Sequence, residues 1–340
     1  MFDAISGAVD GLVLQFGDVQ QALFESVVQP LLFRIGLASY LSDAYDATGW
    51  LLVGLLQIAV MLALIGPLQR WRPIESPPAS AAERSVWRAD VAVDVIYTLI
   101  HRLGLFRVAM FFLIDPLWNA GFGWLAVRGV DGWHLDQWVA PLWPGISDTA
   151  LAGFWVYLVV FDLLNYLLHR AQHQSDAWWA LHAVHHSQRH MSMWTDSRNH
   201  LLDSVLVDTV FVLVARAIGV APGQFVALIA VSQLVENLSH ANVRLGFGWL
   251  GERLLVGPRF HRLHHGLGLG HESHGKGTLG GHNFAVLFPV WDIVFGTARY
   301  CDEVQGTGIR DQLSQEGGRD YGRGFWAQQW LGLKRLAGRA

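Results

Sequence analysis

Apolar residues recur along this chain in runs long enough to cross a bilayer as helices. Between residues 49 and 68 the only polar side chain is Gln57. A helix of about 20 apolar residues spans the hydrocarbon core of a membrane, so this run predicts a transmembrane helix. A second run covers residues 149–168 and leads directly into two histidines. The pattern predicts an all-α protein built as a polytopic membrane helical bundle.

Three further segments are apolar but less regular. Residues 91–118 contain Asp94 and several basic side chains. They indicate either a second span whose polar residues face other helices, or a span preceded by an interfacial piece. Residues 204–220 and 225–238 are joined by Ala221-Pro222-Gly223. Such a turn predicts a helical hairpin that dips into the bilayer and returns.

The loop after the first span indicates the orientation of the chain. Residues 69–90 contain four arginines, whereas residues 119–147 contain one and are expected on the far side as a loop. Cytosolic loops of membrane proteins are enriched in Lys and Arg, so residues 69–90 are predicted to be cytosolic. Counting crossings from there places His169 and His240, each at the end of an apolar segment, on the cytosolic side.

The composition agrees with a membrane protein. Hydrophobic residues make up 52% of the chain and charged residues only 15%, with 16 Trp and 18 Phe, and aromatic residues gather at membrane interfaces. The net charge of −4 comes without a basic block, which argues against nucleic acid as a partner. The single cysteine, Cys301, excludes an internal disulfide framework.

Histidine is concentrated in one part of the chain. Of the 16 histidines, 14 lie between His169 and His282. Residues three or four positions apart share one face of a helix, so two imidazoles at that spacing can reach the same metal ion, and an adjacent third can reach a neighbouring ion. Three clusters have this spacing: His169 and His173; His182, His185 and His186; and His261, His264 and His265.

Together these eight imidazoles indicate a dinuclear metal site. Neutral imidazole binds zinc, iron, copper and nickel. A structural zinc site is closed by four ligands that usually include cysteine, so clusters without thiolate favour a redox-active pair of metals. The alternative is that the histidines are surface residues on amphipathic helices, which explains one pair more readily than three clusters on the same predicted side.

The order of these clusters resembles the fatty acid hydroxylase/sterol desaturase superfamily, whose members are membrane histidine-box di-iron oxygenases. The similarity covers roughly residues 151–300. HxxxH, HxxHH and HxxHH match the three histidine boxes of that family. The chain departs from the family at Leu201, where proline is usual, and in a Gly/His-rich insertion after the third box. Similar family stretches lie at residues 198–203, 239–242, 258–265 and 291–297.

The resemblance implies a set of metal ligands. Glu236, one helical turn before His240, is a candidate carboxylate ligand or supporting partner, or simply a polar residue at a helix end. Ring N–H groups of metal-bound histidines need acceptors, expected among Asp162, Asn165, Asp176, Asp196, Asp203, Glu236, Asn237 and Asp292. His271, His274 and His282 are expected in a loop or facing substrate rather than as ligands. The implied ligands are His169, His173, His182, His185, His186, His261, His264 and His265, with His240 as a ninth.

The resemblance implies an oxidoreductase that uses O₂ and two iron ions to hydroxylate or desaturate a lipid, whether a fatty acyl chain, a sterol, an ether lipid or a carotenoid. No haem-binding or flavin-binding motif is visible, so electrons are expected from a separate electron-transfer protein or reductase. One alternative is a zinc-dependent membrane hydrolase, for which Glu236 is the only well placed general base. Another is a metal-binding membrane transporter, which would place its ionisable residues at mid-membrane.

The sequence predicts four consecutive parts and one location. The parts are an N-terminal helical or interfacial segment (1–48), transmembrane helices with their loops (49–148), a fatty acid hydroxylase-like catalytic domain (149–300) and a cytosolic C-terminal tail (301–340). Residues 325–340 of the tail predict an interfacial helix or short arm, with a solvated tail as the alternative. We expect an integral membrane protein, in the inner or cell membrane if the source is bacterial. A cytosolic helical cap would hold the metal site on the cytosolic face.

Overall fold

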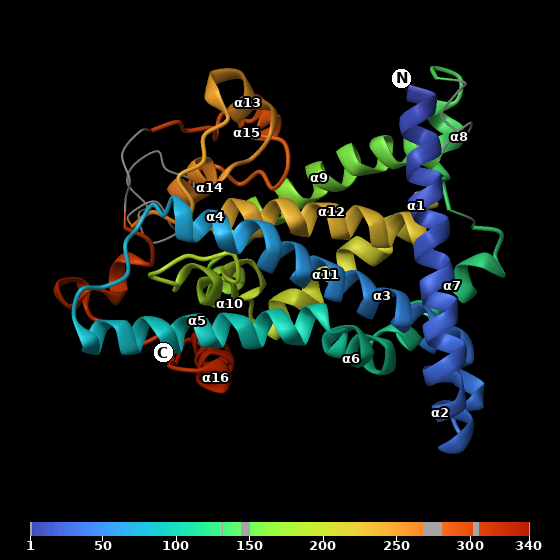
Figure 1. Cartoon of the computed structure of the whole chain (residues 1–340), viewed down its shortest axis with the longest axis horizontal. Helices are drawn as coiled ribbons and strands as arrows, with labels where there is room; N and C mark the ends of the chain where they lie inside the picture. Colours follow the sequence, from blue (N-terminus) through green and yellow to red (C-terminus); the bar gives the residue numbers. More distant parts are fainter. Residues whose placement is uncertain (1, 131, 144–149, 268–280, 302–305, 340) are drawn as a thin grey trace. The chain divides into compact units, whose positions relative to one another are not determined.

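The computed structural model describes residues 2–130, 132–143, 150–267, 281–301 and 306–339, and Figure 1 shows them as helices and connecting segments. Within this part of the chain the only strand-type pairing is an isolated bridge between Gly266 and Thr307. The predicted all-α fold is therefore confirmed.

The chain forms two compact units that interleave along the sequence. Unit 1 comprises Met1–Ile58, Ile100–Val159 and Val212–Ala230, and unit 2 comprises Ala59–Leu99, Val160–Phe211 and Val231–Ala340. The sequence predicted four parts that follow one another along the chain, whereas each unit combines separate segments. The four-part division stays a prediction.

Two helical stretches of the described chain are long and apolar enough to cross a membrane. The first, Ala38–Trp71, holds α3 (Leu41–Val60) and α4 (Gly66–Trp71), which are joined by a π-helical turn. The second, Leu151–Gln174, lies within α9 (Ala150–Gln174). Both predicted spans are thus found as helices. Each is longer than the apolar run that predicted it, because the helix continues into polar residues at its ends.

The segment predicted as a further span is a broken helix. α5 (Ala81–Arg102) and α6 (Leu105–Leu113) meet at a bend of 52° and count as a third candidate span only if taken together. Gly104 stands at the break with φ of +79°, a left-handed conformation that glycine adopts readily. Both alternatives for this region, one span or a span preceded by an interfacial piece, stay predictions.

The long loop expected over residues 119–147 is wrong in part. α7 (Asp115–Ala126) begins with a proline in its first turn and continues well into that range, and α8 (Leu135–Val139) follows. Proline is favoured at the start of a helix because its missing N–H has no helical partner there. Residues 144–149 lie outside the described chain.

The remaining predicted helices are present. α1 (Phe2–Leu23) and α2 (Gln29–Arg34) form the expected helical N-terminus. α11 (Leu201–Ala217) and α12 (Pro222–His240) are the two helices at the segments predicted to form the hairpin. Neither α11 nor α12 is among the candidate spans. Their dip into the bilayer therefore stays a prediction.

Unit 2 also contains the short helices that surround the histidines. These are α10 (Asp176–His186), α13 (Gly248–Leu254), α14 (Pro258–His264) and α15 (Val290–Val294), with α16 (Phe325–Leu336) in the C-terminal segment. α16 packs against α10 and buries Phe325, Gln328, Gln329 and Gly332. The helix predicted there is confirmed, and the alternative of a solvated tail is wrong.

Candidate metal centre

Four separate stretches of unit 2 carry the nine histidines predicted from the sequence. The end of α9 holds the first box, where the helix continues through His169 and His173. α10 holds the second box and starts at Ser175, whose hydroxyl caps the helix by accepting from the backbone N–H of Trp178. α12 ends on His240, and α14 with the residue after it holds the third box. Each cluster therefore lies at or next to a helix end, as the sequence predicts.

The structure gathers all nine imidazoles into groups with metal-binding geometry. His169, His173, His182 and His186 form one group of four, and His185, His240, His261 and His265 form another. A third group, His186, His264 and His265, links the first two. The ligand atoms in each group lie within 4.8 Å of one another. The arrangement is two adjacent four-histidine positions with His264 between them.

Burial lowers the pKa of six of these imidazoles. Each of the nine is at most 8% exposed. Loss of water around those six rings lowers the pKa, because the charged form is poorly solvated inside the protein. The pKa of His264 falls to about 3. That of His185, His186, His261 and His265 falls well below the ordinary value. A neutral ring offers one nitrogen lone pair to a metal.

Acceptor groups fix which nitrogen carries the proton. The Nδ1 atoms of His169, His240 and His264 lie 2.8, 2.8 and 2.7 Å from the backbone carbonyl oxygens of Phe284, Glu236 and His282. Since a carbonyl only accepts, Nδ1 donates in each case and the lone pair is left on Nε2. Three of the nine rings thus have their free nitrogen assigned by the backbone.

The Nε2 atoms that carry these lone pairs lie close to Nε2 atoms of other histidines. His240 Nε2 lies 2.9 Å from His261 Nε2 and 3.1 Å from His185 Nε2, and His264 Nε2 lies 3.1 Å from His186 Nε2. Nitrogens bound about 2.1 Å from one metal ion are separated by roughly 3.0–3.4 Å. The buried Nε2 atoms of His169 and His182 have no hydrogen-bond partner in the described chain. These orphaned lone pairs fit a pair of metal ions.

Asp203 supports the second box from α11. Its carboxylate accepts from His182 Nδ1 at 3.2 Å, from Trp178 Nε1 at 2.6 Å and from the Gln172 amide at 2.9 and 3.1 Å. A carboxylate on the far nitrogen of a ligand histidine orients the ring and raises its basicity. Asp203 is one of the acceptors expected from the sequence, and it has that contact.

A short segment after the insertion supplies two of the carbonyl acceptors. Asp292 accepts from the backbone N–H groups of Phe284 and Ala285 at 2.9 and 2.8 Å, and Asp162 accepts from those of Leu287 and Phe288. These carboxylates hold the backbone that faces His169 and His264. The sequence predicted that Asp162 and Asp292 would accept directly from the imidazoles. Instead, their carboxylates act on the histidines through this backbone segment.

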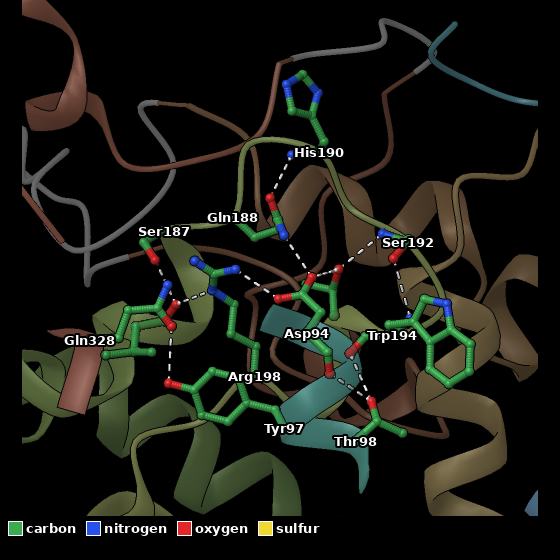
Figure 2. A network of polar contacts seen from close by, with 12 residues as sticks. Asp94, Tyr97, Thr98, Ser187, Gln188, His190, Ser192, Trp194, Arg198 and Gln328 are labelled. Carbon is green, nitrogen blue, oxygen red and sulfur yellow. Dashed lines mark hydrogen bonds and ion pairs between the residues drawn. The ribbon is translucent and has the colours of Figure 1, made fainter. Parts of the chain in front are cut away.

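A buried ion pair anchors the chain beyond the second box. Figure 2 shows Asp94 of α5 with Gln188 and Arg198 around it. The carboxylate accepts from the guanidinium of Arg198 at 2.7 Å and from the amide of Gln188 at 2.6 Å. The side chains of Asp94 and Arg198 are 0% and 4% exposed. Arg198 also donates to the carbonyl of Val184 in α10, so the pair connects α5 to the helix that carries His185 and His186.

Several residues considered in the sequence lie away from the groups. The carboxylate of Glu236 belongs to none of the metal-binding groups of the described chain; its contribution to His240 is the backbone carbonyl. His200 Nε2 contacts the carbonyl of Gln329 in α16. His282 contributes its carbonyl to His264, and His271 and His274 lie outside the described residues.

Sequence reasoning missed two kinds of residue. The carbonyls of Glu236, His282 and Phe284 are invisible to a search for polar side chains, because any residue type offers one. Asp94 was noted as a polar residue in an apolar segment, without its partner. The signal that could have found the carbonyl segment is Asn283, which has φ of +61° and bonds its side chain to the carbonyls of Phe260 and Arg299.

Comparison with known proteins gives one family and several distant relatives. The family described as fatty acid hydroxylase matches residues 154–297, a range that includes all nine histidines. The ornithine lipid hydroxylase OlsE of Rhizobium tropici is 25% identical over 204 residues, or 60% of this chain and 56% of that protein. The alkylglycerol monooxygenases of Caenorhabditis elegans and Danio rerio are each 26% identical over 42% of this chain.

These alignments are partial. This chain spans about half the length of the bacterial relative, and the matched regions cover 26% and 30% of the two animal relatives. No solved structure matches the chain.

Proposed function

Because residues 154–297 belong to the fatty acid hydroxylase family, we propose that this chain is a membrane-bound di-iron oxygenase that hydroxylates an aliphatic carbon of a lipid. The observation that carries the proposal is the arrangement of nine buried histidines in two four-membered groups linked through His264. The candidate spans Ala38–Trp71 and Leu151–Gln174 support a place in the membrane, where a lipid substrate is at hand.

The donor set supports iron over structural zinc. Every member of the two groups is a buried histidine, and the single cysteine, Cys301, is in neither. Iron is among the metals that imidazole binds well, and a pair of iron ions would supply the O₂ activation that attack on an unactivated C–H bond requires. The chain itself would contribute ligand orientation through Asp203 and the three carbonyls, and a site shielded from water.

The activities named for the relatives support hydroxylation of a lipid over desaturation. One is a hydroxylase of ornithine lipid and two are monooxygenases of alkylglycerols. Ornithine lipids and alkylglycerols both carry an acyl or alkyl chain on a polar head. We propose a substrate of the same kind for this protein. Electrons would come from a separate donor protein or reductase.

A zinc-dependent hydrolase is the second candidate, and one observation disfavours it. Such an enzyme needs a carboxylate general base next to a zinc ion with an open position. No carboxylate joins the metal-binding groups of the described chain, and Glu236, the residue considered for that role, faces them with its carbonyl.

The test is to measure metal content, O₂ uptake and product together. The chain purified from its own membranes should contain two irons, consume O₂ when given a reductant, and convert lipid extracts to products heavier by one oxygen atom. His264→Ala should lose iron and activity by at least about tenfold. The matched variant His190→Ala removes a histidine of the same region that belongs to neither group, and should retain both.

Three outcomes would contradict the proposal. The first is a preparation that holds zinc alone and hydrolyses lipid. The second is product lighter by two hydrogen atoms, which would replace hydroxylation by desaturation. The third is full activity in a His264→Ala protein without iron. Thermal unfolding of both variants in detergent separates loss of metal from loss of fold.

A further inference from the structure

The surface of unit 2 exposes large apolar side chains on two short helices, α13 and α15. On α13 these are Trp249, Leu250 and Leu254, with Trp249 74% exposed, and on α15 they include Val294, 66% exposed, and Ile293. Exposed apolar clusters of this kind mark interaction sites in soluble segments. Both helices lie outside the candidate spans, so contact with lipid along a transmembrane helix does not account for these exposed apolar side chains.

A basic basin opens beside these helices. It is a pocket of about 410 Å³ whose wall includes Arg253 of α13, Arg259 of α14 and Arg299, which follows α15. Among the described residues that line it, the acidic side chain is Glu252, which pairs with Arg259 at 3.7 Å. The described lining therefore has three positive charges and one negative charge, which makes this part of the basin complementary to an anion.

The arginines are arranged for anion binding. The guanidinium of Arg253 lies over the rings of Trp249 and Tyr300 at 4.5 and 4.6 Å and donates to the carbonyl of Trp249. Stacking on both rings holds the planar group in place. Guanidinium groups bind phosphate through two parallel hydrogen bonds. Arg253 and both rings line the basin.

We propose that this surface rests on the membrane and that the basin binds the headgroup of an anionic phospholipid. The basin supplies the charge, and the apolar side chains of α13 and α15 would enter the boundary between headgroups and acyl chains. Tryptophan at headgroup level and arginine next to it are typical of interfacial helices. Anionic lipids attract such basic groups. The proposal does not rest on the oxygenase assignment.

The basin is also connected to the candidate metal centre. Phe260 and Leu263 of α14 form part of its wall, and the same helix carries His261 and His264 among its buried residues. A lipid held in the basin would therefore contact the back of the helix that presents the third histidine box.

The chain carries its own reporter of occupancy. Cys301 is the only cysteine and is half-buried in the basin wall. The experiment measures how fast N-ethylmaleimide alkylates Cys301 in the full chain, purified in an uncharged detergent, during titration with dioctanoyl phosphatidylglycerol. Intact mass gives the extent of reaction without ambiguity, because only one thiol is present.

We expect phosphatidylglycerol to slow the alkylation of Cys301 and phosphatidylcholine of the same chain length to leave it unchanged. In Arg253→Gln/Arg259→Gln/Arg299→Gln, the apparent affinity for phosphatidylglycerol should fall on the order of a hundredfold, since each arginine near an anionic surface contributes roughly fivefold. The control Arg310→Gln/Arg323→Gln/Arg339→Gln removes the same charge elsewhere and should keep the wild-type affinity. The single variant Arg299→Gln, expected to lose roughly fivefold, serves if the triple variant does not fold.

Three results would overturn the proposal. Equal protection by phosphatidylcholine would remove the preference for an anion. Protection by inorganic phosphate at the same concentration as the lipid would make the site one for a soluble anion. Unchanged protection in folded Arg299→Gln and in the triple variant would remove the arginines from the site. Since the readout is thiol protection, none of these depends on whether the chain is an oxygenase.

Discussion

At the scale of residues, the candidate centre depends on which nitrogen of each imidazole is free. The backbone carbonyls of Glu236, His282 and Phe284 accept hydrogen bonds from the Nδ1–H groups of His240, His264 and His169. Substituting a residue changes its side chain but leaves its backbone carbonyl in place. Of the four rings with a fixed acceptor, three therefore depend on the backbone and not on the identity of a side chain. Asp203, which faces His182, is the exception, and it can be tested by substitution.

Asp203→Asn should weaken metal binding without removing a candidate ligand. The amide keeps one acceptor oxygen but loses the charge that favours the His182 Nδ1 proton. Loss of such a partner typically costs about 10- to 100-fold in metal affinity or activity. Iron content at limiting iron concentration is the measurement. Asp208→Asn on the same helix is the matched control, and an equal loss there would indicate a general effect on α11.

At the scale of elements, the helices were largely predictable and their partners were not. Runs of apolar residues and i, i+3, i+4 spacing are local, so the spans and the three boxes could be predicted from neighbouring residues. Asp94 and Arg198 lie 104 positions apart, and their pairing depends on which helices become neighbours. The bend at Gly104 and the helix α7 were missed because apolar segments do not indicate where they break.

Breaking the Asp94–Arg198 pair should destabilise unit 2. Asp94→Asn leaves the guanidinium buried without its counter-charge, and loss of one partner of a buried pair costs about 3–5 kcal/mol. The unfolding temperature of Asp94→Asn in detergent should be markedly lower than that of the unsubstituted chain. Asp94→Asn/Arg198→Gln removes both charges and should recover part of this difference. Asp90→Asn, one turn earlier in α5, should have little effect; a drop as large as that of Asp94→Asn would remove the special role of the pair.

In unit 1, α3 passes close to the C-terminal end of α5 at Gly54, and substitution of this glycine tests the contact. A Cβ on Gly54 would lie 1.7 Å from the carbonyl oxygen of Arg102, so Gly54→Ala forces α3 away from the end of α5. Overpacking of this kind costs about 1–3 kcal/mol, which should lower the unfolding temperature in detergent. At Gly121 a Cβ meets nothing within 4 Å. Gly121→Ala should leave the stability of the fold unchanged or raise it by about 0.5–1 kcal/mol. Equal unfolding temperatures for the two variants would contradict the close approach at Gly54.

At the scale of the whole molecule, the orientation of one loop decides the face of the candidate metal centre. The loop after the first candidate span is bound to the segments that carry histidines. The carbonyl of Arg72 accepts from the backbone of Arg244, and the side chain of Asn242, two residues after His240, bonds to the backbone of Glu75. The carboxylate of Glu75 also pairs with Arg262 in the third box. The loop and the centre therefore lie on the same side.

A cytosolic loop would thus mean a cytosolic centre, and surface labelling can test it. In a Cys301→Ser background, Ala79→Cys places a thiol at an exposed position of the arginine-rich loop without removing the Ser80 hydroxyl that bonds Glu83. A maleimide that cannot cross membranes should label Ala79→Cys only after intact cells are permeabilised. Val127→Cys, at a position 87% exposed beyond α7, should react from outside. The reverse pattern would place the histidines on the outer face, where a cytosolic electron donor could not reach them.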